Sequence, residues 1–585
     1  MSAPAGAAAP ADPSRAEKPA DTRPEHTPRS DGRTDTFPAH TPHTPGRAAT
    51  YLARGWWRTE TFLDDLRRQA RERPRKLAVA ARRLKESRTD TLDYAELARL
   101  TDRFAGALLD LGVRRGDAVA VQLPNRWELV ALMFATIRVG AVICPVSPVC
   151  PADELRHRLG LTRARVCVTL PDWEGVPLAA TVAGLRAELP DLAHVLVVDG
   201  PAPEGTRSFH DHFVAQPWEE SRARELEGRE LTADEPFVVL FTSGTTGASK
   251  GVLHSQNTVH SAVRGYVDAF GLGADWVVAV STPLVHYSGF AQGVLAGVLL
   301  GGTVAFQDLR DNPALLDLVE RYGATLLYGP PATLDDVARA QRADPRDTTS
   351  LRHVVIGSAP VLPSLAAEVH ETLGARAHSL WGMSENGPVT TTRPDDPDGW
   401  AAHSNGRPVG SMETRVDPLP DAGSDGVGRL RVRGASLALG YHRRPEAFAA
   451  DLDGEGWFDT GDLARADGRG GIRVLGRARD AIVRDGAVAP AAQLEGAIGT
   501  HPAAVEAALV GLPDAAGRPD ATILAVVVPR DGTGPTLAGL RDHLRSHDHE
   551  ERFLPDRVEV LPALPKTLTG KVRKAVLRAR FSPTS

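Results

Sequence analysis

The chain has 585 residues, of which 42% are hydrophobic and 24% charged, and its formal net charge at pH 7 is −6. The length predicts more than one domain, because single hydrophobic cores stop growing at about 250–300 residues. The acidic balance argues against a nucleic-acid binder held by bulk electrostatics. Cys144, Cys150 and Cys167 are the only cysteines and form no C-x-x-C pair, which argues against a disulfide framework or a zinc site and predicts a cytoplasmic location.

The first 50 residues predict a disordered tail. They are rich in Pro, Ala, Thr and charged side chains and contain almost no large apolar residue before Phe37, so they cannot bury enough surface to fold. No basic start followed by an apolar run marks a signal peptide.

From residue 51 onward, amphipathic helical patterns alternate with short β-branched runs such as AVAVQLP (118–124) and VGAVICPV (139–146). That alternation predicts a mostly parallel α/β domain over residues 51–475. The longest apolar stretch, residues 289–306, is interrupted by Gln292 and by a glycine pair. We interpret it as a buried helix followed by a buried strand and expect no membrane span.

The pattern changes near residue 476. The segment GGIRVLGRARDAIVRDG (470–486) predicts a strand, a sharp turn and a second strand. Short helical and strand patterns follow to the end of the chain and predict a small α+β domain over residues 480–585, within the usual size of a domain.

The stretch FTSGTTGASKGV (241–252) follows a predicted buried strand directly. Its small residues expose backbone N–H groups and hydroxyls that can form a nest for phosphate oxygens, and Lys250 adds a positive charge. It is not a P-loop, because Ser249 precedes the lysine where glycine is needed and Gly251 follows where Ser or Thr is needed. On the loop alone, a phosphate site and a plain surface turn are both open.

Further motifs along the chain identify a family resemblance. The loop resembles the pattern [ST]-[SG]-G-[ST]-T-G-x-P-K-G of the adenylate-forming superfamily, which covers acyl-CoA synthetases, carrier-protein adenylation domains and luciferases. Six more segments resemble that family's motifs in the family's order: PLVHYSG (283–289), GSAP (357–360) with LWGMSENG (380–387), GRLRVRGASLALGY (428–441), GWFDTGDLA (456–464), GRARD (476–480) and PKTLTGKVRK (565–574).

The resemblance implies a fold and a reaction. The fold is a large N-terminal α/β domain with mostly parallel sheets, helices and a small β subdomain, followed by a small mobile α+β lid domain after a hinge at residues 476–479. In the reaction, an acid attacks the α-phosphorus of ATP and releases pyrophosphate, and a nucleophile then displaces AMP. This chemistry needs positive charge and oriented donors around a polyanion.

The resemblance also implies the nucleotide site. The loop would hold the β- and γ-phosphates, Glu385 would bind Mg²⁺ as a hard oxygen ligand, Ser384 would bond the α-phosphate, and Trp381 would face adenine. Asp462 would accept both ribose hydroxyls, and Arg477 would reach the ribose or the α-phosphate. The full set of implied nucleotide-binding residues is Thr242, Ser243, Gly244, Thr245, Thr246, Gly247, Lys250, Ser358, Ala359, Pro360, Trp381, Gly382, Met383, Ser384, Asp462 and Arg477.

By the same resemblance, Lys571 in the lid domain carries the adenylation step by bridging the attacking carboxylate and the α-phosphate. The lid must close for this step and then rotate about the hinge, where Arg479 stands. His286 would lie beside the acyl pocket and gate the way to the nucleophile tunnel. The residues expected to line the acid pocket are His286, Tyr328, Gly357 and Gly382.

The chain departs from the family pattern at three places. Ser249 replaces a proline of the loop, Arg429 replaces a glutamate, and IVRDGAVAP (482–490) is one residue shorter than the usual I-x-x-G-G-x-x-I-x-P, with Asp485 at the first glycine. In thioester-forming relatives this last loop shapes the pantetheine tunnel, so the change weakens the inference of coenzyme A and leaves adenylation untouched.

The leading hypothesis is an ATP- and Mg²⁺-dependent ligase for an aryl or cyclic carboxylate with coenzyme A as co-substrate. A second hypothesis keeps the adenylation and passes the acyl group to a carrier-protein thiol or an amine. A third replaces the carboxylate by nitrite, transferred to an aryl amine as a diazo group. A fourth is a non-catalytic nucleotide-binding protein, against which Lys571, Glu385 and Asp462 argue.

Overall fold

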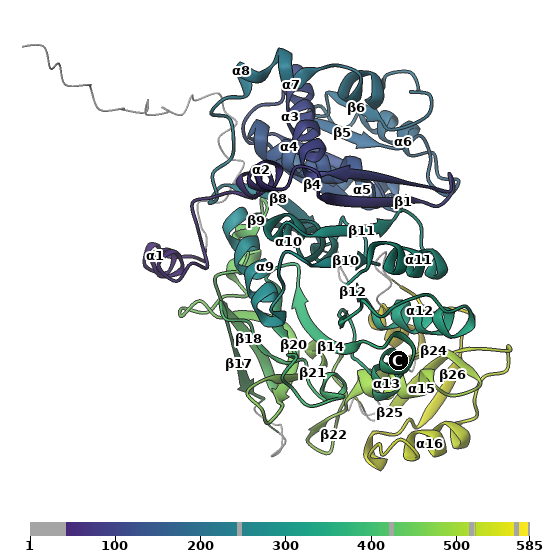
Figure 1. Cartoon of the computed structure of the whole chain (residues 1–585). Helices are drawn as coiled ribbons and strands as arrows, with labels where there is room; N and C mark the ends of the chain where they lie inside the picture. The colour runs from purple at the N-terminus through teal and green to yellow at the C-terminus, as the bar shows by residue number, and fades with distance from the viewer. Residues whose placement is uncertain are drawn as a thin grey trace, which may run out of the picture. The chain divides into compact units, whose positions relative to one another are not determined.

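Two large sheets organise most of the chain in the computed structural model (Figure 1). The model describes residues 42–242, 249–419, 426–513, 520, 522–566 and 572–582. Within these residues, the first sheet has the strand order β16 (Arg407–Pro408), β15 (Gly387–Thr391), β14 (Arg376–Met383), β13 (His353–Ile356), β12 (Leu326–Gly329), β10 (Val277–Val280), β11 (Thr303–Gln307), β1 (Leu77–Arg83) and β2 (Arg88–Asp93).

The second large sheet has the order β19 (Gly440–Tyr441), β9 (Gly251–Ser255), β8 (Pro236–Phe241), β4 (Val142–Val146), β3 (Ala118–Gln122), β5 (Val166–Thr169), β6 (His194–Val197) and β7 (Arg207–Ser208). The central pairs of both sheets are parallel, and antiparallel pairs lie at the edges. The prediction of a mostly parallel α/β domain is confirmed.

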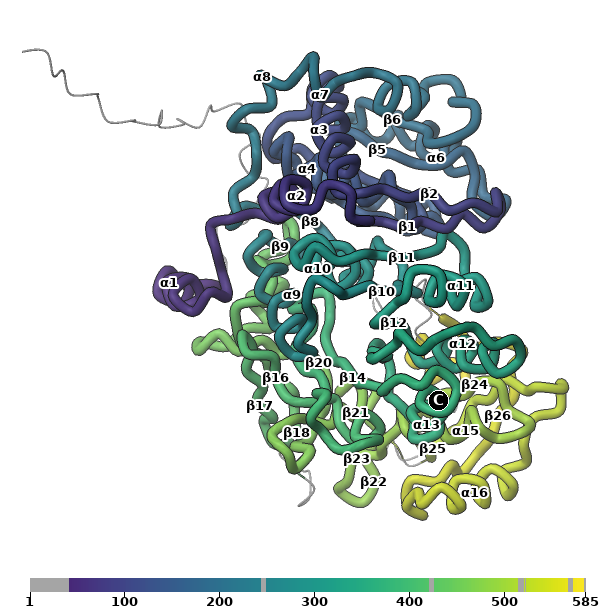
Figure 2. Tube along the Cα trace, in the orientation of Figure 1, coloured from purple at the N-terminus to yellow at the C-terminus, as the bar shows by residue number. Residues whose placement is uncertain are grey.

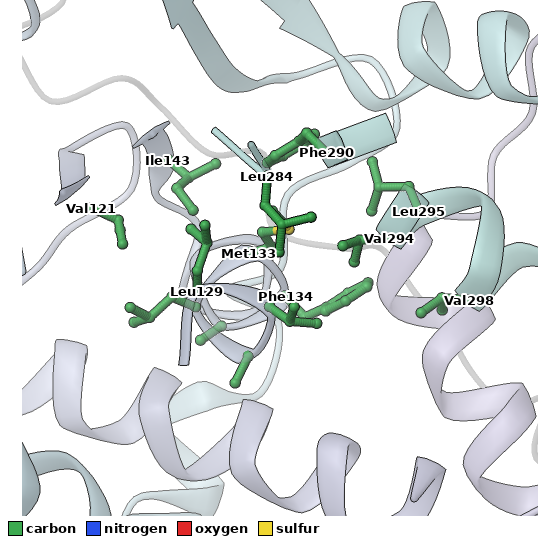
Figure 3. Packing of buried hydrophobic residues seen from close by; sticks show 14 of the residues in the cluster. Val121, Leu129, Met133, Phe134, Ile143, Leu284, Phe290, Val294, Leu295 and Val298 are labelled. Carbon is green, nitrogen blue, oxygen red and sulfur yellow. The ribbon is translucent and has the colours of Figure 1, made fainter. Parts of the chain in front are cut away.

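A layer of helices lies between the two sheets. These helices are α2 (Phe62–Glu72), α3 (Tyr94–Asp110), α4 (Trp127–Val139), α9 (Gln256–Phe270), the π-helix η3 (Ser288–Leu295) and α10 (Ala296–Leu300). The sheets face this layer with alternate residues, as the period of a strand requires: Val278 and Val280 point into it, whereas Ala279 packs on the opposite face. In Figure 3, Met133 and Phe134 of α4 lie between Ile143 of β4 and Val294 of η3.

Further helices cover the outer faces. On the first sheet these are α11 (Asn312–Tyr322), α12 (Pro331–Ala343) and α13 (Pro363–Leu373). On the second sheet they are α5 (Ala152–Thr162) and α6 (Leu178–Leu185). Short helices η2 (His210–Val214), α7 (Trp218–Ser221) and α8 (Ala223–Leu226) pack on α3. Both faces of each sheet are therefore buried, which explains the continuous apolar runs of the central strands.

A small antiparallel sheet and the lid domain complete the chain. The small sheet has the order β17 (Met412–Pro418), β18 (Gly428–Gly434), β20 (Phe458–Ala466) and β21 (Ile472–Arg477), with η4 (Trp400–Ala402) and α14 (Pro445–Ala449) beside it in the chain. η5 (Ala478–Asp480) spans the end of the predicted hinge and the first residue of the predicted lid. The lid region then contains β22 (Val483–Arg484), β23 (Ala487–Val488), α15 (Ala491–Gly499), β24 (Ala504–Leu512), β25 (Thr522–Pro529), α16 (Leu537–Arg545), η6 (Glu551–Phe553), β26 (Arg557–Val560) and α17 (Lys574–Phe581). The predicted fold class is confirmed in both parts.

The apolar stretch 289–306 forms η3, α10 and β11, so it is a buried helical segment followed by a buried strand, as expected. No helix within the described ranges is long and apolar enough to cross a bilayer. The three cysteines are buried free thiols.

The expectation of disorder up to residue 50 is wrong for its last residues, because helix α1 (Pro45–Ala53) begins inside that segment. Thr44 caps the helix by accepting from the Arg47 N–H group, and a proline occupies its first turn. Tyr51 at its end is buried. The aromatic residues that follow the polar tail supply apolar surface for burial, and an average composition over residues 1–50 does not include them.

Candidate active site

Four of the predicted site residues lie at the carboxyl edge of the first sheet, where ligands bind in open α/β folds. His286 follows β10, Tyr328 is the penultimate residue of the neighbouring β12, Gly357 follows β13, and Glu385 lies in the turn after β14. The strand register aligns these ends, since Val280 pairs with Tyr328 in parallel register and β13 pairs with β14 in the same sense. Segments from distant parts of the sequence therefore converge on one edge.

The phosphate loop connects β8 to β9 as a hairpin. The Thr242 N–H group donates to the Lys250 carbonyl at 3.0 Å, which closes the base of the loop. Ser249, which replaces the family's proline, is buried, donates from its hydroxyl to Glu154 of α5, and accepts at its carbonyl from the His157 Nε2 atom at 3.1 Å. The stiffness lost with proline is thus replaced by anchors to α5. The predicted phosphate ligands Ser243, Gly244, Thr245, Thr246 and Gly247 lie outside the described residues.

Lys250 and Glu385 meet through a tyrosine. The Lys250 ammonium lies 4.4 Å from the ring centroid of Tyr441, within the range of a cation–π interaction. The Tyr441 hydroxyl donates to Glu385 Oε1 at 2.8 Å. Strand pairing brings them together, because β19, which carries Tyr441, is paired with β9 next to the lysine. The Lys250 ammonium, the Tyr441 ring and the Glu385 carboxylate are therefore successive neighbours beside the loop.

Burial is the main influence on Glu385. Its side chain is almost fully enclosed, and this desolvation raises the pKa of the carboxyl above its usual range. The hydrogen bond from Tyr441 and the positive charges of Arg477 and Lys250 oppose that rise. The carboxylate is thus held by surrounding donors and cations, at the position where the family resemblance expects a metal ligand.

The backbone of the Glu385 turn is fastened by three hydrogen bonds to other segments. The Ser384 carbonyl accepts from His254 Nε2 at 2.7 Å, and the Glu385 carbonyl accepts from the Ala438 N–H group at 2.8 Å. The Asn386 carbonyl accepts from the Ser436 hydroxyl at 2.7 Å. Each consecutive carbonyl of the turn has its own donor, so the position of the Glu385 side chain is set by two other parts of the chain.

His254 is a neutral donor in this arrangement. Burial lowers its pKa to about 4. Its Nδ1 atom lies 2.9 Å from the Thr258 hydroxyl, so Nδ1 accepts from that hydroxyl while Nε2–H donates to the Ser384 carbonyl. The histidine links β9, which leaves the phosphate loop, to the Glu385 turn.

The second group of nucleotide candidates lies on the small sheet. Asp462 in β20 is buried and accepts from the indole N–H group of Trp381 at 3.2 Å, while Arg477 Nε lies 3.2 Å from its Oδ1 atom. Antiparallel pairing of β20 with β21 sets Asp462 opposite Arg477. Trp381 is itself largely buried in the core beneath the small sheet. Its role is therefore partly structural, because its polar edge orients the aspartate.

The remaining candidates are exposed or half-buried. Ser358 and Ala359 are exposed in the short loop after β13, Pro360 is half-buried, and Ser358 has a left-handed φ of +74°. Met383, the last residue of β14, and Ser384, which follows it, are half-buried. The structure thus brings Trp381, Ser384, Glu385, Asp462 and Arg477 into one region with Lys250.

Two predicted pocket residues are direct neighbours. A Cβ atom added to Gly357 would lie 2.7 Å from the Tyr328 hydroxyl, so glycine is needed there for the tyrosine to keep its place. Burial raises the pKa of Tyr328 to about 12, and its hydroxyl interacts with Ser288 and Gln292 of η3. His286 is half-buried at the start of the segment that leads into η3.

Gly382 has a different constraint. A Cβ atom at this position would lie 2.0 Å from the Gly387 carbonyl oxygen across the β14–β15 hairpin. The glycine is therefore required by close backbone approach at the base of the Glu385 turn.

The predicted hinge, residues 476–479, includes the last two residues of β21 and the first two of η5. Arg479 is exposed, and its Nε atom lies 3.6 Å from Asp480 Oδ2. Asp480 also pairs with Arg578 of α17 at 2.9 Å. The C-terminal helix is thus tied to the first residues after the hinge. Lys571 lies outside the described residues, and its loop is closed at the base by an antiparallel bridge between Lys566 and Val572.

Comparison with known proteins decides the family. Residues 66–442 match the AMP-binding enzyme family, and residues 493–571 match the AMP-binding enzyme C-terminal domain. The chain belongs to the AMP-binding enzyme family. The predicted resemblance is confirmed, and the protein is an ATP-dependent ligase that activates an acid with formation of AMP.

Three relatives show the range of this similarity. The chain is 32% identical over 548 residues to 2-hydroxy-7-methoxy-5-methyl-1-naphthoate–CoA ligase of Streptomyces carzinostaticus, with 90% of this chain and 94% of that protein covered. It is 31% identical over 541 residues to salicyl-AMP ligase/salicyl-S-ArCP synthetase of Mycobacterium tuberculosis (strain ATCC 25618 / H37Rv), covering 90% and 92%. The solved amide bond synthetase McbA from Marinactinospora thermotolerans matches with a TM-score of 0.73 and 28% identity, covering 89% of this chain and 100% of that chain.

Sequence reasoning gave no role to Tyr441 or His254. Tyr441 ends the motif GRLRVRGASLALGY, and its place beside the strand that follows the loop is known only from the pairing of β19 with β9. His254 is a lone histidine inside the apolar run GVLHS, and a polar residue in a buried strand calls for a polar partner.

Proposed function

We propose that this enzyme activates an aryl or cyclic carboxylate as its acyl-AMP anhydride and transfers the acyl group to the thiol of coenzyme A. The observation that carries the adenylation half is the convergence of Lys250, Tyr441 and Glu385 with the pair Asp462–Arg477, brought together from three different sheets. The aryl class is supported by the naphthoate and salicyl relatives.

In the first step a carboxylate oxygen attacks the α-phosphorus of ATP, a new P–O bond forms, and the bond to the β-phosphate oxygen breaks to release pyrophosphate. In the proposal, the loop residues and Lys250 hold the leaving pyrophosphate. Asp462 orients the ribose through its hydroxyls, and Lys571 neutralises charge between the carboxylate and the α-phosphate.

Glu385 fits the binding of Mg²⁺ with the nucleotide. Mg²⁺ is held in such sites by one or two carboxylates together with substrate phosphates and water. Glu385 supplies one buried carboxylate whose Oε1 atom is oriented by Tyr441. Within the described residues there is no cluster of three acidic, His or Cys side chains that would make a separate cage. Bound there, Mg²⁺ would offset phosphate charge.

In the second step the thiol sulfur attacks the acyl carbon, the bond to the AMP oxygen breaks, and the thiol proton passes to solvent. We propose that the lid domain after residues 476–479 rotates about Arg479 between the two steps. The hairpin β22–β23, expected at the thiol tunnel, turns at Asp485 and Gly486, both with positive φ. This two-residue turn is compact and acidic.

The test is pyrophosphate release measured with aryl, cyclic and straight-chain carboxylates and with nitrite, at fixed MgATP. Release with aryl or cyclic acids alone supports the proposal, whereas release with nitrite alone favours the diazo-forming alternative. The acceptor is then tested with coenzyme A, a phosphopantetheinyl carrier protein and an aryl amine, with AMP release as the measure. A rate increase only with the carrier protein or the amine would contradict the choice of coenzyme A.

A further inference from the structure

A segment at the start of the described chain contacts residues 435–438, which in turn hold the Glu385 turn. We call residues 43–58 the strap. It contains α1 and the two tryptophans that follow, and it lies wholly before residue 66, where the match to the AMP-binding enzyme family begins. In Figure 2 its trace runs from α1 to α2.

The strap is fastened by two aromatic donors. His43 Nε2 lies 2.7 Å from the Leu437 carbonyl, so this nitrogen carries the proton and donates. The Trp57 indole N–H group donates to the Ala435 carbonyl at 2.9 Å. The two rings stand edge to face with centroids 4.9 Å apart, and Tyr51 packs against both. His43, Tyr51 and Trp57 are each less than 10% exposed.

The segment 435–438 that receives these donors is also the segment that fastens the Glu385 turn. Its first and third residues, Ala435 and Leu437, present carbonyls to the strap. Its second and fourth, Ser436 and Ala438, donate to the carbonyls of Asn386 and Glu385. Residues 435–438 form a turn between β18 and β19 in which alternate residues contact the strap and the Glu385 turn, so a displacement on one side is passed to the other.

We propose that His43 and Trp57 are positioning residues for Glu385, acting through the 435–438 segment to hold its carboxylate where MgATP binds. The proposal rests on the role of Glu385 given under the proposed function. His43 and Trp57 do not touch the reacting atoms.

The strap has a second attachment, at its C-terminal end. The Arg58 N–H group donates to Asn257 Oδ1 at 2.8 Å, and Asn257 Nδ2 donates to the Arg58 carbonyl at 2.9 Å. The Trp56 carbonyl lies 3.1 Å from His260 Nδ1. The end of the strap is therefore held to α9 independently of the 435–438 segment.

The test uses four variants of the full chain. His43→Phe and Trp57→Phe keep an aromatic ring and remove the N–H donor. His43→Gln keeps an amide donor and serves as the conservative variant. Thr50→Ala is the matched control in the strap, because the Thr50 hydroxyl bonds only within α1, to the Gly46 carbonyl.

The first measurement is hydrogen–deuterium exchange of the protein without ligands, in peptides that cover residues 384–388 and 435–441. We expect faster exchange in both peptides for His43→Phe and Trp57→Phe, and wild-type exchange for Thr50→Ala. The second is steady-state kinetics of pyrophosphate release. We expect the KM for MgATP to rise about fivefold in the two Phe variants, the effect of one lost hydrogen bond, with the KM for the acid unchanged and partial recovery in His43→Gln.

Glu385→Gln is assayed beside them. If it raises the KM for MgATP while both Phe variants match wild type in exchange and kinetics, the strap proposal is overturned and the proposed function stands. If Glu385→Gln leaves the KM for MgATP unchanged, the assigned role of Glu385 fails and the strap proposal fails with it.

Discussion

Tyr441 donates a hydrogen bond of 2.8 Å to the Oε1 atom of Glu385 while its ring lies 4.4 Å beneath the Lys250 ammonium. One neutral side chain therefore orients both a cation of the phosphate loop and a carboxylate of the proposed metal site. Because β19 pairs with β9, this tyrosine moves with the strand that leaves the loop. A change at Tyr441 should therefore affect both Lys250 of the loop and the carboxylate of Glu385.

We expect Tyr441→Phe to lower kcat/KM for MgATP by about 10- to 100-fold. Phenylalanine keeps the ring under Lys250 and removes only the hydroxyl, and a hydrogen bond to a charged group contributes about 1.5–3 kcal/mol. Pyrophosphate release at varied MgATP is the measurement. Tyr322→Phe is a matched control, since Arg321 lies over the Tyr322 ring at 5.6 Å in the same manner on α11. Equal losses in the two variants would show that the Glu385 bond has no specific role.

Much of this site can be predicted from the sequence, and the residues that cannot be predicted share a physical reason. Glu385, Asp462 and Lys250 were found because each belongs to a short motif whose residues are adjacent in the chain. Tyr441 and His254 were not, because their partners come from distant segments: Tyr441 is placed by the pairing of β19 with β9, and His254 contacts the Ser384 carbonyl of another sheet. No local pattern records such contacts. Gly382 was predicted as a pocket residue, whereas the structure requires it for backbone contact with Gly387.

The N-terminal segment shows the same limit, because its sequence predicts disorder where the structure has the start of a helix. Composition divides the chain by average content and therefore places the boundary of the tail at residue 50, inside helix α1. Helix α1 is formed by residues whose burial depends on Ala435, far along the chain. A helix whose stability comes from tertiary packing gives little signal in its own composition.

We expect Gly357→Ala to raise the KM for the acid by roughly 5- to 150-fold and to leave the KM for MgATP near the wild-type value. The added methyl would lie 2.7 Å from the Tyr328 hydroxyl, and Tyr328 is buried, so the ring must move into the space proposed for the acid. Overpacking of this kind costs about 1–3 kcal/mol. Kinetics with the preferred acid measure the effect.

Gly184→Ala is the control for that change, because a methyl there meets no atom within 4 Å and the residue lies in helix α6. An unchanged acid KM in Gly357→Ala would mean that Tyr328 does not border the acid. A comparable rise in the KM for MgATP would place Gly357 at the nucleotide.

We expect Lys571→Ala to abolish pyrophosphate release while ATP still binds. A cation about 4 Å from a developing charge contributes roughly 4 kcal/mol at an effective dielectric of 20, which is about a thousandfold in rate. Calorimetric titration with MgATP separates binding from chemistry. Lys566→Ala is the control, because Lys566 sits at the base of the same loop and pairs with Glu506 at 2.7 Å. Unchanged pyrophosphate release in Lys571→Ala would remove this lysine from the mechanism.

His254 provides a pH-dependent test of the contacts around the Glu385 turn. In the folded protein burial lowers its pKa to about 4, whereas an unfolded histidine titrates near 6.5. Between these values the unfolded chain binds more protons, so stability rises with pH through the window and is lost as pH falls from about 6.5 towards 4. Protonation would also place a proton on Nδ1, which accepts from Thr258.

We therefore expect the free energy of unfolding of His254→Gln to depend less on pH than that of the wild type. Between pH 7 and pH 5 the wild type should lose about 2 kcal/mol more free energy of unfolding than the variant, from the titration of this one residue. Urea unfolding at both pH values gives the difference, and any constant cost of the lost hydrogen bonds cancels in it. His210→Gln, at an exposed position, should retain the wild-type slope. Parallel pH dependences for wild type and His254→Gln would mean that the imidazole is not held neutral, and the donor role assigned to its Nε2–H group at the Ser384 carbonyl would then fail.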